Sequence, residues 1–314
     1  MGSAAKPVVS VVMVVDYAVG SAAAWGELRR TLEALAGQDF DEPVEYLYVD
    51  EEGSNRPPPP DVLDILPGIK VLWRPGTTSY DLLNAGMRAA TADIIAILDP
   101  DCVPDGDWLR VLVAGMREHP EAAVVNGLTT YMMRSRLEHI VALVDRGENV
   151  HNRVAPVKFI TKNNSAYRRE VVLAHPLSSD AGPFGVGRQA ESILQAGGTI
   201  LYQPGMRVIH AYEGWGQLRD SRRHQGYATV ALRLLDPTFR YAGIVRLGMI
   251  AIPAMVAYRL VGNLVHSFRA RRQYGVRWYE LPVAVWFAVV VGALEIPGMI
   301  RAYRRRPIVE TEFR

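Results

Sequence analysis

Apolar positions in the first hundred residues follow two alternating patterns. Four largely apolar runs have the length of strands: residues 8–15, 44–49, 69–73 and 94–98. Between them, residues 25–36 and 79–90 carry apolar side chains at helical spacing. Strands that are apolar on both faces and alternate with helices are typical of an α/β protein, in which helices cover both faces of a parallel sheet.

Acidic residues stand where two of these runs end. Asp50 and Glu51 close the second run, and Asp99 and Asp101 follow the fourth. In an open sheet of this kind, ligands bind beyond the carboxyl ends of the strands, so we expect these acids to face one crevice. The four consecutive prolines at 57–60 predict a loop between the second and third strands.

The pair Asp99 and Asp101 predicts a metal site. A carboxylate at the end of a buried strand is costly unless a partner compensates its charge, and a divalent cation does so while also neutralising a phosphate. Two residues apart on an extended strand, both side chains share a face, so one could bind the ion directly and the other through water. The alternative is that both are solvated loop residues or caps of the helix that starts near Trp108.

Composition narrows the class of protein. The chain has 314 residues, 49% of them hydrophobic and 22% charged, enough for a sizeable core in one large or two small domains. A net charge of +2 argues against a nucleic-acid-binding protein. The single cysteine, Cys102, excludes an intrachain disulfide, builds no zinc site and favours a reducing compartment. The N-terminus lacks the apolar segment of a signal peptide, so we expect the body of the protein in the cytoplasm.

The last third of the chain carries two long apolar runs. The run at residues 281–300 is long enough to span a bilayer. The run at residues 241–268 is interrupted by two arginines and a proline. If both runs spanned, the arginine-rich link at 269–277 would lie outside, against the positive-inside tendency. A hairpin lying on the cytoplasmic face of the membrane satisfies these charges better. The alternative is a pair of buried helices that closes the soluble domain or a dimer.

Several stretches of the sequence resemble one enzyme family. VSVVMVVDY, YLYVDEEGS and SYDLLNAGMRAATADIIAILDPDC follow in order the pattern of family 2 glycosyltransferases of the GT-A type, and KNNSAYRREVV and AGGTILYQPGMRVIH are similar to its later segments. The resemblance covers roughly residues 8 to 230. It implies a Rossmann-like, mostly parallel sheet with helices on both faces, followed here by C-terminal hydrophobic helices. We therefore predict a nucleotide-sugar and acceptor domain at 1–235 and a membrane-associated helical region at 236–314.

The resemblance assigns donor-binding residues in the first half of the chain. It implies that Asp50 or Glu51 contacts the uracil and ribose of the donor, and that Asp16 lies where the base edge is held. Asn84 and Gly86 match the N-x-G helix of the family. The alternatives are that Asp16 is an ordinary turn residue and that Asn84 and Gly86 only permit close helix–sheet packing.

The resemblance also implies a metal centre. Asp99 and Asp101 match the family's Asp-x-Asp motif and would hold Mn²⁺ or Mg²⁺ against the diphosphate, where the metal acts as a Lewis acid on the leaving nucleoside diphosphate. His210 could approach the metal or the diphosphate, although a single histidine at a strand end is more often a structural hydrogen-bonding residue. Arg219, Arg222, Arg223 and His224 are candidates to reach the diphosphate; the alternative is a solvated helix.

The catalytic base departs from the family pattern. The family normally has an aspartate in a Gly-Glu-Asp motif, but Gly185 and Val186 stand in place of the expected acids. An inverting transfer needs a carboxylate to take the acceptor proton, and the nearby candidates are Glu191 and Asp180. Glu191 could instead pair with Arg188 on the helix surface, and the enzyme could be inactive or activated by its acceptor.

The resulting prediction is a metal-dependent glycosyltransferase at the cytoplasmic face of the cell membrane. It would move a sugar, with inversion, from a UDP-linked donor to a lipid-linked or envelope-polysaccharide acceptor. One alternative is an inactive homologue that acts as a membrane scaffold. Another is a nucleotidyltransferase, which would be expected to have a basic, glycine-rich loop after the first strand; DYAVGSAAAWG contains no lysine or arginine.

Overall fold

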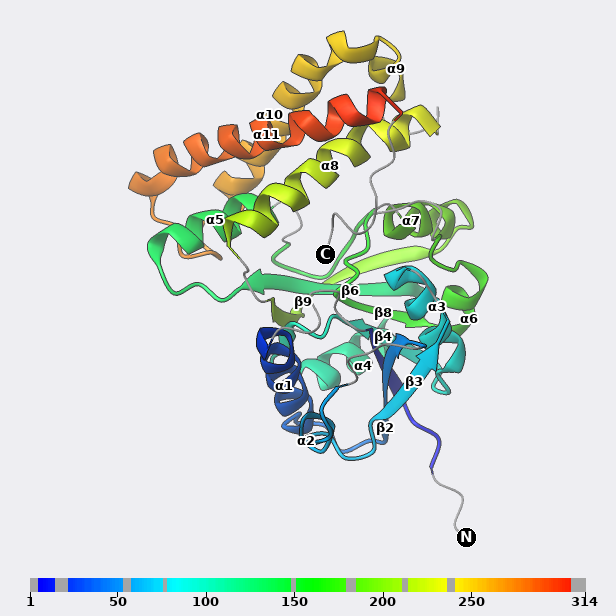
Figure 1. Ribbon diagram of the computed structural model, residues 1–314. Coiled ribbons are helices and arrows are strands. Elements are labelled where there is room, and N and C mark those ends of the chain that lie inside the picture. Colours follow the sequence, from blue (N-terminus) through cyan, green and yellow to red (C-terminus); the bar gives the residue numbers. More distant parts are fainter. Residues whose placement is uncertain are drawn as a thin grey trace.

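The computed structural model describes residues 5–14, 22–52, 58–75, 78–147, 151–178, 185–210, 214–235 and 241–305. Within these ranges a central sheet carries helices on both faces, and long helices gather at one end of the molecule (Figure 1). The mixed α/β architecture confirms the predicted fold class. Two of the predicted site residues, Asp16 and Asp180, lie outside the described ranges.

The four predicted strands form the parallel half of the sheet. β1 (Val9–Val14) lies between β2 (Val44–Glu51) and β4 (Ile94–Leu98), and β3 (Lys70–Arg74) lies beyond β2. All three neighbouring pairs are parallel. Their bounds differ from the prediction by at most two residues. β1 and β4 are buried throughout, and apart from Ser10 their sequence is apolar.

The other half of the sheet is mixed. β8 (Asn164–Arg168) pairs antiparallel with both β4 and β6 (Ala122–Tyr131), and β9 (Thr199–His210) runs parallel to β6. The short β5 (Cys102–Pro104) pairs antiparallel with the end of β9, and β7 (Ala155–Pro156) pairs antiparallel with the same strand. Since β4, β6 and β9 run in the same direction, their carboxyl ends lie at one edge of the sheet, where ligands bind in folds of this type.

Helices cover both faces of this sheet. α1 (Ala22–Ala36) and α4 (Trp108–Glu118) lie on one face, and α3 (Ser79–Ala89) and α6 (Arg169–Ala174) on the other. α7 (Gly185–Gln195) packs on β9.

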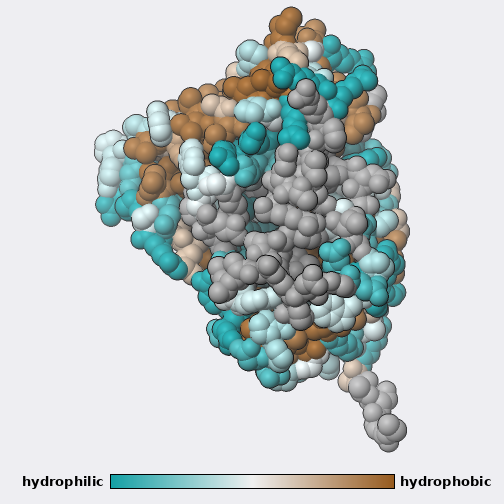
Figure 2. Space-filling model, in the orientation of Figure 1, coloured by the Kyte–Doolittle hydropathy of each residue, from teal (hydrophilic) through white to brown (hydrophobic). Residues whose placement is uncertain are grey.

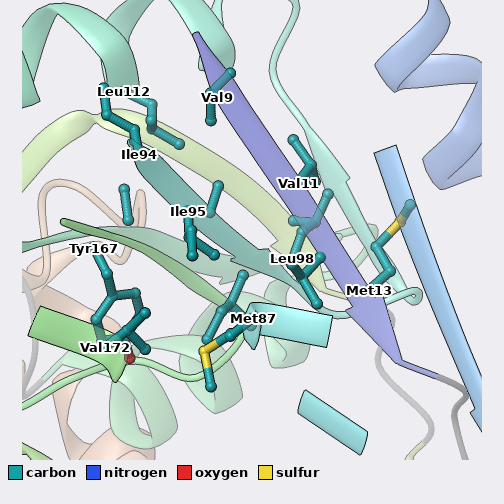
Figure 3. Close-up of a cluster of buried hydrophobic side chains, with 14 of the residues drawn as sticks. Val9, Val11, Met13, Met87, Ile94, Ile95, Leu98, Leu112, Tyr167 and Val172 are labelled. Atoms are coloured by element: carbon teal, nitrogen blue, oxygen red, sulfur yellow. The ribbon is translucent and has the colours of Figure 1, made fainter. Parts of the chain in front are cut away.

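Apolar side chains fill the space between the strands and these helices (Figure 3). Leu112 of α4 approaches β4 from one side, and Met87 of α3 and Val172 of α6 approach from the other. All three side chains are buried. The core therefore lies where the apolar pattern of the sequence predicts it.

The proline run ends in a short helix. α2 (Pro60–Leu63) begins at the fourth proline, in a stretch for which we predicted only a loop. Proline is tolerated at the first position of a helix because the N–H that it lacks would have no partner there.

The helices at the end of the molecule form what we call the helical unit. Its members are α5 (Arg136–Arg146), α8 (Trp215–Leu235), α9 (Ala242–Val245), α10 (Ile252–Ala270) and α11 (Leu281–Tyr303). α11 packs along α8 and α10 and also contacts α5 (Figure 1). The two predicted C-terminal apolar helices are thus present as α10 and α11.

The contact between α8 and α11 brings their backbones together. A β-carbon at Gly298 would overlap the carbonyl oxygen of Arg223, and one at Gly226 would overlap that of Glu295. Glycine is therefore required at both positions for this close approach. The domain boundary predicted between residues 235 and 236 would place α8 in the first domain, although α8 packs on α9 and α11 of the second.

Candidate functional site

Asp101 and His210 meet at the carboxyl edge of the sheet. The antiparallel pairing of β5 with β9 places Cys102 opposite His210, so Asp101, one residue earlier, lies beside the imidazole. Asp101 Oδ2 is 3.2 Å from His210 Nε2, and both residues are buried. They line a pocket of about 280 Å³ together with two arginines, Arg30 and Arg134, and two acids, Glu27 and Glu138. Arg30 pairs with Glu27 at 3.4 Å, but guanidinium groups also suit a phosphate.

The geometry of this pair fits a divalent ion. Adjacent ligands of an octahedral ion with bonds of about 2.1 Å lie about 3 Å apart, close to the separation of Asp101 Oδ2 and His210 Nε2. Cys102 lies within the same cluster. Without a bound ion, burial raises the pKa of the Cys102 thiol, and the charges of Asp101 and Asp99 raise it further. The carboxylate oxygen of Asp101 suits Mn²⁺ or Mg²⁺, and the imidazole nitrogen of His210 is a ligand that Mg²⁺ takes less readily.

The two aspartates of the Asp-x-Asp motif have different neighbours. Asp99 lies near Lys162, with 3.4 Å between its Oδ1 and the lysine Nζ, whereas Asp101 contacts His210. Neither caps the following helix, because the N-cap of α4 is Asp107. The cap interpretation is therefore wrong. Lys162 had not been predicted, since it precedes β8 and only the antiparallel pairing of β8 with β4 brings it to Asp99.

Asp50 carries a buried oxygen without a hydrogen-bond partner. Its side chain is 1% exposed at the carboxyl end of β2; Oδ1 accepts the Glu51 N–H at 2.7 Å, and Oδ2 has no partner among the described residues. Burial raises the pKa of the carboxyl, the Glu51 N–H lowers it in part, and the Glu51 carboxylate adds a further increase. Buried polar atoms are nearly always paired, so this oxygen is suited to receive a ligand hydroxyl. The Glu51 side chain, by contrast, is exposed.

Asn84 and Gly86 hold local structure together. Asn84 Nδ2 donates to the carbonyl oxygen of Leu177 at 2.8 Å, and the Leu177 N–H donates to Asn84 Oδ1 at 3.0 Å. The asparagine therefore fixes the segment that leads towards α7. A β-carbon at Gly86 would lie 2.6 Å from Val12 Cγ1, so glycine permits α3 to pack closely on β1. Close helix–sheet packing therefore describes Gly86, whereas Asn84 holds the backbone at Leu177.

Glu191 lies in a second pocket. The pocket has a volume of about 460 Å³ and is lined by α7, by Pro176 and Ser178 before it, and by Leu232 and Leu235 at the end of α8. Glu191 Oε1 accepts a hydrogen bond from Gln195 Nε2 at 3.3 Å. The pocket that contains Asp101 and His210 is lined by other residues.

Gly185, which stands in place of an acid of the family's Gly-Glu-Asp motif, has no room for a side chain. A β-carbon at Gly185 would lie 2.7 Å from Cε2 of Tyr80 and 2.8 Å from the carbonyl oxygen of Ser178. Any side chain at this position would displace α3 or the chain before α7. An acid therefore does not fit at Gly185 with this packing.

Arg222 does not lie at the diphosphate position that we predicted. Its side chain is 1% exposed, and its guanidinium forms ion pairs with Asp145 of α5 and Glu295 of α11. With carboxylates on two sides it joins three helices of the helical unit. The structure thus places Arg222 in the interior of the helical unit and not at a surface that a diphosphate could reach. The two acids beside it lie 77 and 73 residues away in sequence, so the local sequence did not indicate this burial. Arg223 is half exposed beside Asp220, at 3.9 Å.

Tyr131, next to His210, and Asp145, which contacts Tyr131, had not been predicted. Tyr131 ends β6 opposite His210, and its hydroxyl donates to Asp145 Oδ2 at 2.6 Å. A signal was present for Asp145: the Ser135–Glu138 capping box marks the start of α5, and the apolar residues after it place the aspartate on a buried face. No comparable signal existed for Tyr131.

Comparisons with known proteins identify the family. The model of glycosyl transferase family 2 matches residues 18–174, half of the chain, so the chain belongs to this family. Among solved structures, it is similar to the mannosyltransferase PcManGT from Pyrobaculum calidifontis in complex with GDP-mannose and Mn²⁺, with a TM-score of 0.63 and 17% identity over 96% of this chain and 89% of that one. No curated protein matches the chain significantly. The protein is therefore a glycosyltransferase that uses a nucleotide-sugar donor, and its fold is of the GT-A type.

Proposed function

We propose that this glycosyltransferase is metal-dependent and inverting, and that it transfers a sugar from a UDP-linked donor to a lipid-linked or envelope-polysaccharide acceptor at the cytoplasmic face of the cell membrane. The observation that carries the proposal is the buried pair Asp101 and His210, 3.2 Å apart and facing a pocket at the carboxyl edge of the sheet. The similar mannosyltransferase structure is a complex with Mn²⁺, which supports metal dependence here.

Each side chain at this edge has a role in the proposal. Mn²⁺ or Mg²⁺, when bound, supplies Lewis-acid stabilisation of the leaving nucleoside diphosphate. Asp101 and His210 would hold the ion. Asp50 Oδ2 would accept a hydroxyl of the donor nucleoside, because it lacks another partner among the described residues. Arg30 and Arg134 would take over the diphosphate contact expected of Arg222, since they line the metal pocket.

The identity of the donor nucleotide is the least constrained part of the proposal. Asp50, at the acidic end of β2, is placed to bind the ribose of a nucleoside. A contact with the ribose does not distinguish uridine from guanosine. The similar mannosyltransferase structure contains GDP-mannose, so GDP-sugars are the second candidate donors.

The catalytic base is proposed to be Glu191 or Asp180. Inversion by direct displacement needs one carboxylate at the acceptor. Glu191 belongs to the 460 Å³ pocket, which also contains hydroxyl and amide groups together with Leu232 and Leu235, a lining that suits a sugar with an apolar neighbour. An inactive homologue is the competing proposal, and the glycine at 185 favours it.

Membrane attachment is proposed to use the outer face of α10 and α11. Two helices, Gly248–Ala270 and Trp278–Tyr303, are long and apolar enough to cross a membrane. Their exposed apolar side chains include Ile250, Phe268 and Trp286, and the surface over this region is largely hydrophobic (Figure 2). On its inner face α11 is joined to α8 by the backbone contact at Gly298, so a position on the membrane surface keeps that contact intact.

A nucleotide-sugar screen tests the proposed activity. Thermal shifts of the full chain with UDP- and GDP-sugars, each with and without Mn²⁺, should identify one donor that stabilises the protein only with the metal. Hydrolysis or transfer of that donor should follow. Metal-dependent nucleotide binding without any turnover would support the inactive homologue instead, and binding that ignores Mn²⁺ would refute metal dependence.

A further inference from the structure

His210 is held between two strands and against one aromatic ring. It pairs with Cys102 of β5 on one side and with Tyr131 of β6 on the other. The Tyr131 and His210 rings lie edge to face, with centroids 5.9 Å apart and an angle of 88°. Because the tyrosine ring limits rotation of the imidazole, it influences where Nε2 points.

Tyr131 is itself fixed by a buried carboxylate. Its hydroxyl donates to Asp145 Oδ2 at 2.6 Å, and the guanidinium of Arg146 lies over its ring at 5.0 Å. Burial alone would raise the pKa of Asp145, but Arg222, Arg146 and the Tyr131 hydroxyl outweigh it and lower the pKa to about 2. The carboxylate is therefore charged at neutral pH and is a strong acceptor for the tyrosine.

The same contacts continue into the C-terminal helices. Arg222 of α8 forms ion pairs with Asp145 and, at 3.5 Å, with Glu295 of α11. Arg259 of α10 donates to Glu295 Oε1 at 2.8 Å. Polar contacts thus run without a break from the helical unit to the ring beside His210.

We propose that Tyr131 and Asp145 are positioning residues, which hold the His210 imidazole in the orientation that a metal ion needs. The inference rests on the proposed metal site and deepens it. Outer groups that orient a ligating histidine commonly change metal affinity by tenfold or more when they are removed. In this protein the orientation is transmitted by a ring contact and by the hydrogen bond behind that ring.

A chain of buried charges is not needed for stability alone. Apolar side chains of similar volume often stabilise a buried site as well as an ion pair does. The charged residues here end on a tyrosine whose ring contacts the candidate metal ligand, and a positioning role explains that arrangement.

The test is direct Mn²⁺ binding to the full chain, measured by electron paramagnetic resonance of the free ion, with melting temperature recorded in parallel. Tyr131→Phe removes only the hydroxyl, and Tyr131→Leu also removes the ring. Tyr167→Phe is the matched control, since it removes another buried hydroxyl, which donates to Gln189 at 3.1 Å; Tyr167 lies on β8 opposite Val124, at the other end of β6 from Tyr131. We expect the Mn²⁺ dissociation constant to rise about threefold or more in Tyr131→Phe and about tenfold in Tyr131→Leu. In Tyr167→Phe it should stay within twofold.

The outcomes separate this inference from the metal site itself. His210→Ala must weaken Mn²⁺ binding; if it does not, the proposed metal site fails and the inference fails with it. If His210→Ala weakens binding but Tyr131→Phe stays within twofold of the wild type, Asp145 has no positioning role. If Tyr131→Leu also binds normally, the inference is refuted as a whole. Should Tyr131→Leu not fold, Tyr131→Phe alone decides.

Discussion

Arg222 of α8 and Glu295 of α11 form an ion pair in the interior of the helical unit, with 3.5 Å between Nη1 and Oε1 and both side chains 1% exposed. Glu295 also pairs with Arg259 of α10. One carboxylate therefore pairs with two arginines at the point where three helices meet, and Asp145 is a second acidic partner of Arg222. The C-terminal apolar helices are joined to the enzyme by charge as well as by apolar packing.

Loss of this carboxylate should destabilise the protein strongly. Glu295→Ala leaves Arg222 buried with one acid fewer, and removal of one partner from a buried ion pair costs about 3–5 kcal/mol. Asp220→Ala is the control, because Asp220 pairs with exposed arginines on the same α8 and such pairs contribute about 0–1 kcal/mol. Chemical unfolding of the full chain measures both. Equal stability of the two variants would contradict the described network.

A second prediction concerns acid stability. Burial raises the pKa of Glu45, but hydrogen bonds from Ser10, Lys70 and Thr91 outweigh this and lower it to about 2. A lowered pKa means that the charged form stabilises the folded state; this contribution is complete above the unfolded pKa of 4.5 and is lost as the pH falls towards 2.

Glu45→Gln should therefore be less stable than the wild type at neutral pH. The difference in unfolding free energy should shrink as the pH falls from about 4.5 to 2. Unfolding curves over this range provide the measurement. A difference that stays constant with pH would show that the Glu45 carboxylate is not specifically stabilised in the folded protein.

The first half of the fold was predictable because its two central strands, β1 and β4, are buried on both faces. β4 was predicted at its observed bounds, since Ile94–Leu98 is a continuous apolar run. The insertion of β8 between β4 and β6 was not predictable, because Asn164 and Arg168 give the strand a polar sequence and its partners are distant in the chain. Short-range patterns predict strands but not the pairing of strands separated by several elements.

The site shows the same limit. His210 was expected near the metal of Asp101 only through the family resemblance, and it is the pairing of β5 with β9 that brings the two side chains together. Arg222 lies in the basic stretch RDSRRHQ, which has the pattern of an exposed or phosphate-binding helix. Its burial depends on Asp145 and Glu295, neither of which is close in sequence, so no local pattern could indicate it.

The exposed face of α10 and α11 should determine membrane binding. Phe268 and Trp286 are 64% and 65% exposed, and their burial in a lipid surface contributes roughly 1.5–3 kcal/mol each. In flotation with vesicles that contain about one third anionic lipid, the full chain should float, and Phe268→Ser with Trp286→Ser should lower binding about tenfold or more.

Trp73→Ser is the control for this experiment, since Trp73 is a partly exposed tryptophan on β3 at the far edge of the sheet. It should float like the wild type. If the double variant also floats like the wild type, the face does not bind the membrane. A stable dimer without lipid would show that a second copy covers the face instead.

Glu191 is proposed as one candidate base, and its substitution tests the role. Glu191→Gln keeps the shape of the side chain in the 460 Å³ pocket but cannot take a proton, so turnover should fall about a hundredfold with little change in donor affinity. Turnover and donor binding are measured separately with the donor identified by the screen. Turnover close to the wild type would exclude Glu191 and leave Asp180 as the candidate.

The central claim is that Asp101 and His210 hold a divalent ion against the donor diphosphate. Calorimetric titration of the full chain with UDP, and with GDP if the screen favours it, in the presence and absence of Mn²⁺ tests this most directly. We predict that Asp101→Ala loses the Mn²⁺-dependent part of nucleotide binding while the protein remains folded, because the carboxylate faces the pocket and not the core. Asp107→Ala, in the same acidic segment, should bind like the wild type. Unchanged Mn²⁺-dependent nucleotide affinity in Asp101→Ala would contradict the account.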